Sequence, residues 1–102
     1  MGGEQYPILV YGPKQKRSVH EWVRTFGLVS KYDDAFDAVD TFLKSHHMTM
    51  VFDNNCCWDS PCVGMEVPNF ETFTGRDSVV EFCRRFKLPA PTFYAGLVGE
   101  LE

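Results

Sequence analysis

Two segments near opposite ends of this chain have almost the same sequence, and both have the pattern of a capped amphipathic helix. Residues 18–28 (SVHEWVRTFGL) and 78–88 (SVVEFCRRFKL) align without a gap and share Ser, Val, Glu, Arg, Phe and Leu. In each segment a Ser precedes a Glu by three residues, which is a capping box that starts a helix. Apolar residues then recur at i, i+3, i+4 and i+7, one face of a helix. We therefore predict helices beginning at Ser18 and Ser78 that lie together on one face of a sheet.

The ends of these two helices have different stop signals. Gly27 supplies the first stop, since glycine readily adopts the left-handed conformation of a helix end. Leu88-Pro89 ends the other helix. An ancient duplication and convergence both explain the match, and the poor alignment of the flanking residues favours convergence. The copies differ most at His20/Val80, Thr25/Arg85 and Gly27/Lys87.

The remaining segments complete an α+β pattern. A helix capped by Asp33 or Asp34 would turn Phe36, Val39, Phe42 and Leu43 inward. Apolar runs predict strands at residues 6–11, 48–52, 63–67 and 92–98. The predicted order is therefore β-α-α-β-β-α-β: about three helices packed on a mixed or antiparallel sheet of three or four strands. A hairpin with a long loop is the simplest link between residues 48–52 and 63–67, and parallel pairing stays open.

Composition restricts the class of protein. The 102 residues fit a single domain spanning 1–102, in which we expect residues 1–5 and 101–102 to be disordered or vector-derived. A hydrophobic content of 44% supplies a core without a metal or a disulfide, so no cofactor is expected. No apolar run is long enough for a bilayer, and no signal peptide is recognisable, so we expect a cytoplasmic protein with reduced cysteines and no membrane partner.

Aromatic residues in loops and an acidic stripe predict a protein-binding surface. Trp58 lies in a polar loop, and Phe70 and Phe73 lie in a segment without clear periodicity. The spacing of Asp33, Asp37 and Asp40 forms the acidic stripe on one helix face. Such aromatics serve as anchors and such charges as the rim of an interface. The alternative is a satellite core under the loops, which is as well supported for Trp58 and favoured for Phe70 and Phe73.

Basic residues predict an alternative, anion or nucleic-acid binding. Lys14, Lys16 and Arg17 lie between a strand and a helix N-terminus, where backbone N–H groups favour anions. The segment is not a Walker loop, and Pro13 removes one donor. Arg84 and Arg85 would join these residues in one basic surface, although the net charge of −4 weakens binding through phosphates alone.

Residues 78–95 (SVVEFCRRFKLPAPTFYA) distantly resemble the first helix and strand of double-stranded-RNA-binding domains. In that family a Glu-bearing helix is followed by a Leu-Pro turn and a Tyr-containing strand. The resemblance implies RNA binding. It ends at Gly99-Glu100, before the second and third strands and the Lys-rich last helix that carry most phosphate contacts in such domains.

A cysteine and histidine cluster forms a second alternative, a metal or thiol site. Cys56, Cys57 and Cys62 share one loop, and His46-His47 precede it by one strand. The cluster lacks a Cys-x-x-Cys pair, and adjacent histidines point in different directions, so the pattern is weak for zinc. Cys83 falls on the apolar face of a helix and is expected in the core.

No catalytic set is recognisable. We therefore interpret the sequence as a small non-enzymatic protein-binding module, such as an inhibitor, an adaptor or a viral or phage-type accessory protein, whose partner is another protein.

Overall fold

The computed structural model describes residues 5–28, 35–52 and 60–99. Its elements follow the predicted order β-α-α-β-β-α-β. They are β1 (Gln5–Gly12), α1 (Val19–Phe26), α2 (Ala35–Ser45), β2 (Thr49–Val51), β3 (Cys62–Glu66), α3 (Arg76–Arg85) and β4 (Thr92–Gly99). The predicted α+β class is confirmed, with three helices and four strands.

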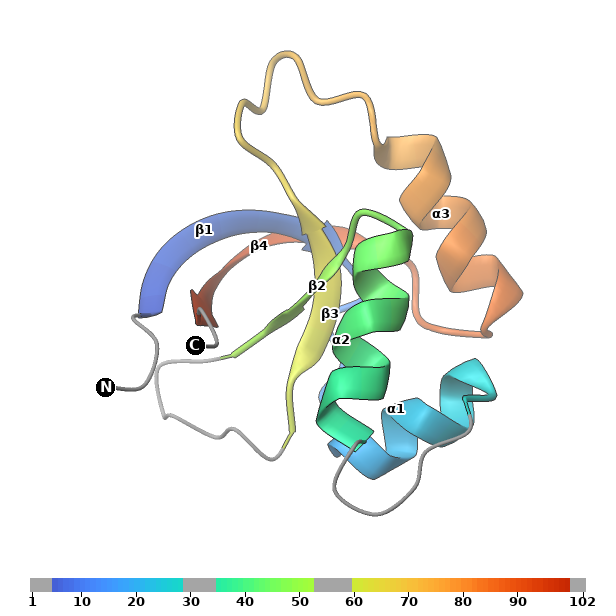
Figure 1. The fold of residues 1–102 in the computed structure, drawn as a ribbon. Coiled ribbons are helices and arrows are strands. Elements are labelled where there is room, and N and C mark those ends of the chain that lie inside the picture. Colours follow the sequence, from blue (N-terminus) through green and yellow to red (C-terminus); the bar gives the residue numbers. More distant parts are fainter. Residues whose placement is uncertain (1–4, 29–34, 53–59, 100–102) are drawn as a thin grey trace.

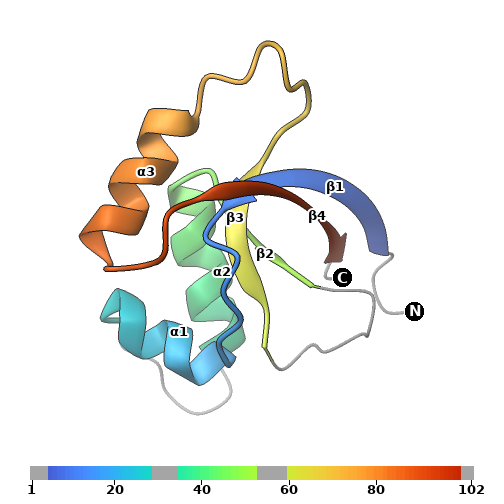
Figure 2. The same cartoon turned by 180° about the vertical axis from the view of Figure 1, so that it is seen from behind.

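The four strands form one antiparallel sheet in the order β2-β3-β1-β4. β2 and β3 pair antiparallel, as a hairpin requires, and β1 pairs with β4 along its whole length. Beyond β2, Phe52 forms a bridge to Leu97, with N···O distances of 2.9 and 2.8 Å. This bridge joins the two edges of the sheet at one point. β1 and β4 accordingly arch over β2 and curl the sheet (Figures 1 and 2).

The three helices lie on one side of the sheet, with α2 beside β2 and α3 beside β1, and seal the main core (Figure 1). The ring of Phe26 in α1 lies 4.7 Å from Phe42 of α2, 5.5 Å from Phe82 and 5.1 Å from Phe86. Trp22 is fully buried, and its indole Nε1 donates to the Pro61 carbonyl oxygen at 2.8 Å. The expectation that α1 and α3 lie together is confirmed.

A second, smaller cluster lies on the other face of the sheet. Val10, Val51 and Cys62 are buried there, with Ile8 and Tyr94 packed against them. Neighbouring side chains lie very close to the backbone at Gly64 and Gly96. A Cβ atom at these positions would overlap Val10 and Val51, respectively. We call this face the concave face.

The N-termini of α1 and α3 differ. α1 has the predicted capping box: Glu21 N–H donates to Ser18 Oγ at 3.1 Å, and Ser18 N–H donates to the Glu21 carboxylate at 2.9 Å. α3 instead begins at Arg76, after Gly75, without a side-chain cap. The capping box predicted at Ser78 is therefore wrong. A Cβ atom at Gly75 would overlap the Met65 sulfur and the Phe73 ring, so this close packing favours glycine directly before the helix.

All three helices end in the same way. A residue with positive φ lies one or two positions after each helix, and the N–H of the next, apolar residue bonds to the carbonyl five residues earlier. The positive-φ residues are Gly27 (66°), His47 (60°) and Lys87 (57°). The bonds are Leu28 to Val23 (3.0 Å), Met48 to Leu43 (2.8 Å) and Leu88 to Cys83 (2.8 Å). The stop predicted at Gly27 is confirmed, whereas α3 ends at Arg85, before the predicted Leu88-Pro89.

Candidate functional site

The face of β1 and β4 opposite the concave face carries a group of aromatic side chains. Tyr11 and Phe93 are register partners, so their side chains share a face, and their ring centroids lie 4.4 Å apart. Phe73 lies 5.8 Å from Tyr11, and Phe70 lies 4.9 Å from Phe93. The Arg76 guanidinium lies 5.1 Å from the Phe93 ring centroid. We call Tyr11, Phe70, Phe73, Phe93 and Arg76 the aromatic surface.

Phe70 is the most exposed member of this surface. It is 56% exposed, more than any other large hydrophobic residue in the described ranges, while Tyr11, Phe73 and Phe93 are half-buried. The core placement favoured for Phe70 is therefore wrong. Its loop, between β3 and α3, projects from the domain instead of folding under the helix (Figure 1). A turn in this loop is held by Glu71 N–H donating to Asn69 Oδ1 at 2.9 Å.

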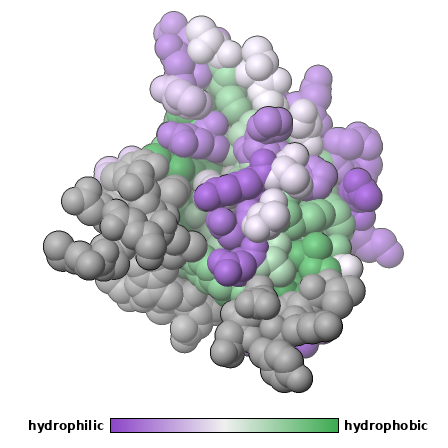
Figure 3. Space-filling view, viewed as in Figure 1, coloured by the Kyte–Doolittle hydropathy of each residue, from purple (hydrophilic) through white to green (hydrophobic). Residues whose placement is uncertain are grey.

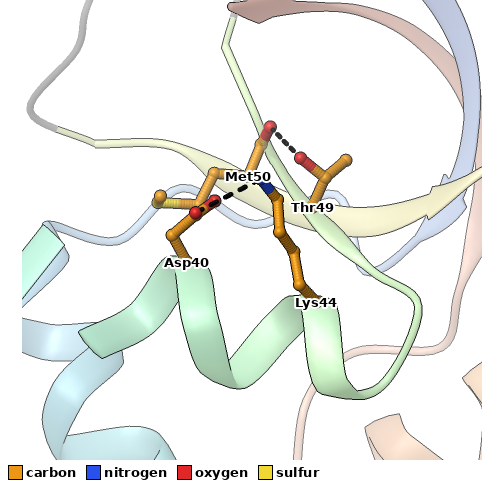
Figure 4. A network of polar contacts seen from close by, with 4 residues as sticks. All are labelled: Asp40, Lys44, Thr49 and Met50. Carbon is orange, nitrogen blue, oxygen red and sulfur yellow. Dashed lines mark hydrogen bonds and ion pairs between the residues drawn. The ribbon is translucent and has the colours of Figure 1, made fainter. Parts of the chain in front are cut away.

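The predicted acidic stripe lies elsewhere. Asp37 is exposed on the first turn of α2, and hydrophilic residues gather over this helix in the centre of Figure 3. Asp40 pairs with Lys44 at 3.4 Å, beside Met50 of β2 (Figure 4). Trp58 and Asp33 lie outside the described residues.

Arg17 has a structural role. Its Nη1 donates to Thr25 Oγ1 at 2.6 Å, and its Nε and Nη2 donate to Gln15 Oε1 at 3.1 and 2.9 Å. Its guanidinium also lies 5.2 Å from the Trp22 ring centroid. Arg17 therefore ties the β1–α1 loop to α1.

The other predicted basic residues lie at separate places. Lys14 and Lys16 line a pocket of about 300 Å³ that opens from the concave-face cluster. Arg85 lines a different groove of about 320 Å³ that shares no described residue with that pocket. Arg84 makes a loose, exposed ion pair with Glu81 at 3.9 Å. These two cavities therefore place Lys14 and Lys16 apart from Arg85.

The histidines and the described cysteines do not converge. His46 packs on Phe42 at 4.7 Å, and with exposed His47 it lines the groove that contains Arg85. Cys62 and Cys83 are buried in different elements, β3 and α3. Burial raises the pKa of the Cys83 thiol to about 11, which keeps it protonated at neutral pH.

The metal-site hypothesis gains no support from the described residues. Within residues 5–28, 35–52 and 60–99, no three His, Cys, Asp or Glu side chains are grouped to hold a metal ion. Cys56 and Cys57 lie outside these ranges.

Comparisons with other proteins assign no class. The chain matches no family model, no curated protein and no solved structure. In the described part of the chain, every helix is too short or too polar to span a bilayer.

Sequence reasoning missed Tyr11, Phe93 and Arg76 as members of the surface. A partial signal exists, since Phe93, Ala95 and Leu97 alternate with other residues along β4 and so share a face. The pairing of Tyr11 with Phe93 joins residues far apart in the chain, and no local pattern predicts it.

Proposed function

We propose that this protein is a small non-enzymatic protein-binding module and that the aromatic surface is its docking site. The observation that carries the proposal is the position of Phe70, which is 56% exposed while its ring packs in a T-shaped contact with Phe93. Burying a fully exposed phenyl ring contributes about 1.5–3 kcal/mol, so burying the 56% of Phe70 that is exposed would contribute about half of that. Because Phe93 already supports the ring, little conformational entropy is lost on binding.

Arg76 defines the chemistry of the partner. Its guanidinium stacks on Phe93, and within the described residues it makes no ion pair. A stacked guanidinium keeps its N–H groups available for a carboxylate. The proposed partner therefore presents an apolar side chain to Phe70 and a carboxylate to Arg76. Aromatic and arginine side chains together are typical of interface hot spots.

The biological role that fits this site is that of an inhibitor, an adaptor or an accessory protein in the cytoplasm. We also propose the acidic face of α2, where Asp37 is exposed, as a second and separate region of contact with a protein partner.

Selection of binding peptides tests the proposal directly. Peptides are selected from a displayed random library on the wild-type domain, and their dissociation constants are measured for wild type, Phe70→Ser and Arg76→Gln. We expect Phe70→Ser to weaken binding about tenfold or more and Arg76→Gln to weaken it several-fold, with acidic residues enriched in the peptides.

Pro89→Ser is the matched control, because Pro89 is exposed between α3 and β4, outside the aromatic surface. Amide chemical-shift changes on titration should include Tyr11 and Phe93. Peptides that bind Phe70→Ser as tightly as wild type would contradict the proposal. Retention on RNA that falls steeply with salt, without any peptide binding, would favour the nucleic-acid alternative.

A further inference from the structure

One face of α3 lines a groove of about 320 Å³. The α3 residues in its lining recur at i, i+3, i+4 and i+7, the spacing of a single helix face. They are Ser78, Glu81, Phe82 and Arg85. The turn between α2 and β2 lies beside α3 (Figure 1) and lines the groove from the other side with its two histidines. We call this cavity the α3 groove.

The α3 groove has an apolar component. Phe82 and Met48 are 6% and 3% exposed, and Met65 of β3, which also lines the groove, is half-buried. The His46 ring packs on Phe82 with centroids 5.4 Å apart. An apolar side chain of a ligand would contact the two methionines, whose flexible thioethers adapt to different shapes.

The α3 groove continues toward the aromatic surface. A neighbouring cavity of about 430 Å³ shares His47, Met65 and Ser78 with it. Phe73, a member of the aromatic surface, lines this second cavity together with other residues of the β3–α3 loop. The two cavities therefore connect α3 with the loop that carries Phe70.

Two opposite charges lie on the α3 side of the groove. Glu81 and Arg85 are exposed and four residues apart, which places their Cβ atoms about 5–6 Å from each other. Glu81 makes a loose ion pair with Arg84 at 3.9 Å, and the Arg85 guanidinium lies 5.3 Å from the Phe86 ring centroid. Among the described residues Arg85 forms no ion pair. Both charges are therefore available to a ligand in the groove.

An extended peptide matches the spacing of these charges. Its side chains at positions i and i+2 lie on the same face, about 6.6 Å apart. Between Ser78 and Arg85, α3 rises about 10.5 Å, which three or four extended residues would cover. A peptide with opposite charges at i and i+2 can thus place its cation at Glu81 and its carboxylate at Arg85.

We infer that the α3 groove holds an extended segment of the protein partner, in which two opposite charges two positions apart pair with Glu81 and Arg85. Apolar side chains of the same segment contact Met48 and Met65. The inference rests on the proposed function, because this segment continues from the part of the partner that binds the aromatic surface.

Peptide selection on a charge-exchanged domain tests the inference. A displayed library of random peptides is selected in parallel on wild type and on Glu81→Arg/Arg85→Glu, which have the same net charge. We expect wild type to enrich opposite charges two positions apart in one order, and the variant to enrich the reverse order. Peptides selected on wild type should bind the variant about tenfold more weakly, and exchange of their two charges should restore the affinity.

Asp40→Lys/Lys44→Asp is the matched control, because it exchanges an ion pair of the same i,i+4 spacing on α2. It should leave the order of charges in the selected peptides unchanged. Thermal unfolding checks that both exchanged domains are folded. Arg85→Gln, a milder change, should weaken binding of the peptides selected on wild type several-fold.

The outcomes separate this inference from the proposed function. Peptides that lose affinity on Phe70→Ser but bind the charge-exchanged domain as tightly as wild type would overturn the inference and leave the proposed function intact. The same order of charges selected on both domains would also overturn it. Peptides that follow the charge exchange but bind Phe70→Ser as tightly as wild type would support the groove and contradict the docking role of Phe70.

Discussion

Helices α1 and α3 carry matching sequences, and they are alike at their C-termini and different at their N-termini. After α1, Gly27 adopts positive φ and Leu28 N–H bonds back to Val23. After α3, Lys87 adopts the same conformation and Leu88 N–H bonds back to Cys83. The C-terminal motif therefore forms at equivalent positions even though Lys replaces Gly.

At the N-termini, equivalent serines have different roles. Ser18 caps α1, whereas Ser78 lies inside α3 and is exposed. The C-terminal end of each helix depends on a backbone hydrogen bond between residues five apart and on an apolar residue that packs on the core. Directly before α3, Gly75 instead packs closely against Met65 of β3. The comparison teaches that a local motif dictates a helix boundary only where tertiary packing does not act against it.

Replacing Trp22 by the residue that α3 has at the same place should cause the largest effect. Trp22→Phe removes the indole N–H that donates to Pro61 and leaves a cavity in a fully buried position. We expect a loss of about 2–3 kcal/mol in the free energy of unfolding, measured by urea denaturation. A loss below about 0.5 kcal/mol would contradict a stabilising role for the hydrogen bond from the Trp22 indole to Pro61.

Gly75→Ala tests whether packing sets the start of α3. The added Cβ atom would overlap Met65 and Phe73, so we expect a destabilisation of about 1–3 kcal/mol. The double variant Gly75→Ala/Met65→Ala removes the side chain that the new Cβ atom would overlap. Its loss in the free energy of unfolding should therefore be smaller than the sum of the losses in the two single variants. Additive free energies would contradict the proposed role of this contact.

Alanine at the two serines distinguishes the two N-termini. Ser18→Ala removes an observed cap and should cost about 1 kcal/mol. Ser78→Ala alters an exposed residue within α3 and should change stability by less than about 0.5 kcal/mol. Equal losses, measured by thermal and urea unfolding, would mean that Ser78 also caps a helix in solution.

Glycine at Lys87 should make the two C-termini equivalent. Lys87 has φ of 57°, a conformation that costs a residue with a Cβ atom about 1–2 kcal/mol. Because glycine also gains entropy in the unfolded chain, we expect a net stabilisation of only about 0.5 kcal/mol. His47→Gly should likewise stabilise the fold, whereas Gly27→Lys should lower the free energy of unfolding.

The capping box of α1 should give the smallest effect, a pH dependence. Hydrogen bonds from the Ser18 backbone and side chain lower the pKa of Glu21 below its usual value of 4.5. A lowered folded-state pKa means that the stabilisation is fully present above about pH 4.5 and is lost as the pH falls through the folded-state pKa. Glu21→Gln should flatten this part of the stability curve, with Glu81→Gln as the control in α3.

The candidate site could be predicted only in part. Phe70 and Phe73 were identifiable as aromatics outside any periodic element, and they do belong to one surface. The basic loop was identifiable from composition, but its residues have separate roles: Arg17 binds Thr25, whereas Lys14 and Lys16 line the pocket. Which side chain turns inward within a loop depends on contacts with distant segments, and the local pattern does not contain that information.

The sequence by itself determined the class of fold, the order of the elements and the buried face of each helix. These properties follow from side-chain periodicity and from caps, which act over a few residues. Only the tertiary structure decided the strand order β2-β3-β1-β4, the closure of the sheet at Phe52 and Leu97, and the start of α3 at Arg76. It also decided that Phe70 stays exposed on Phe93. Each of these depends on the packing of residues that are distant in the chain, which is selected by the whole fold at once.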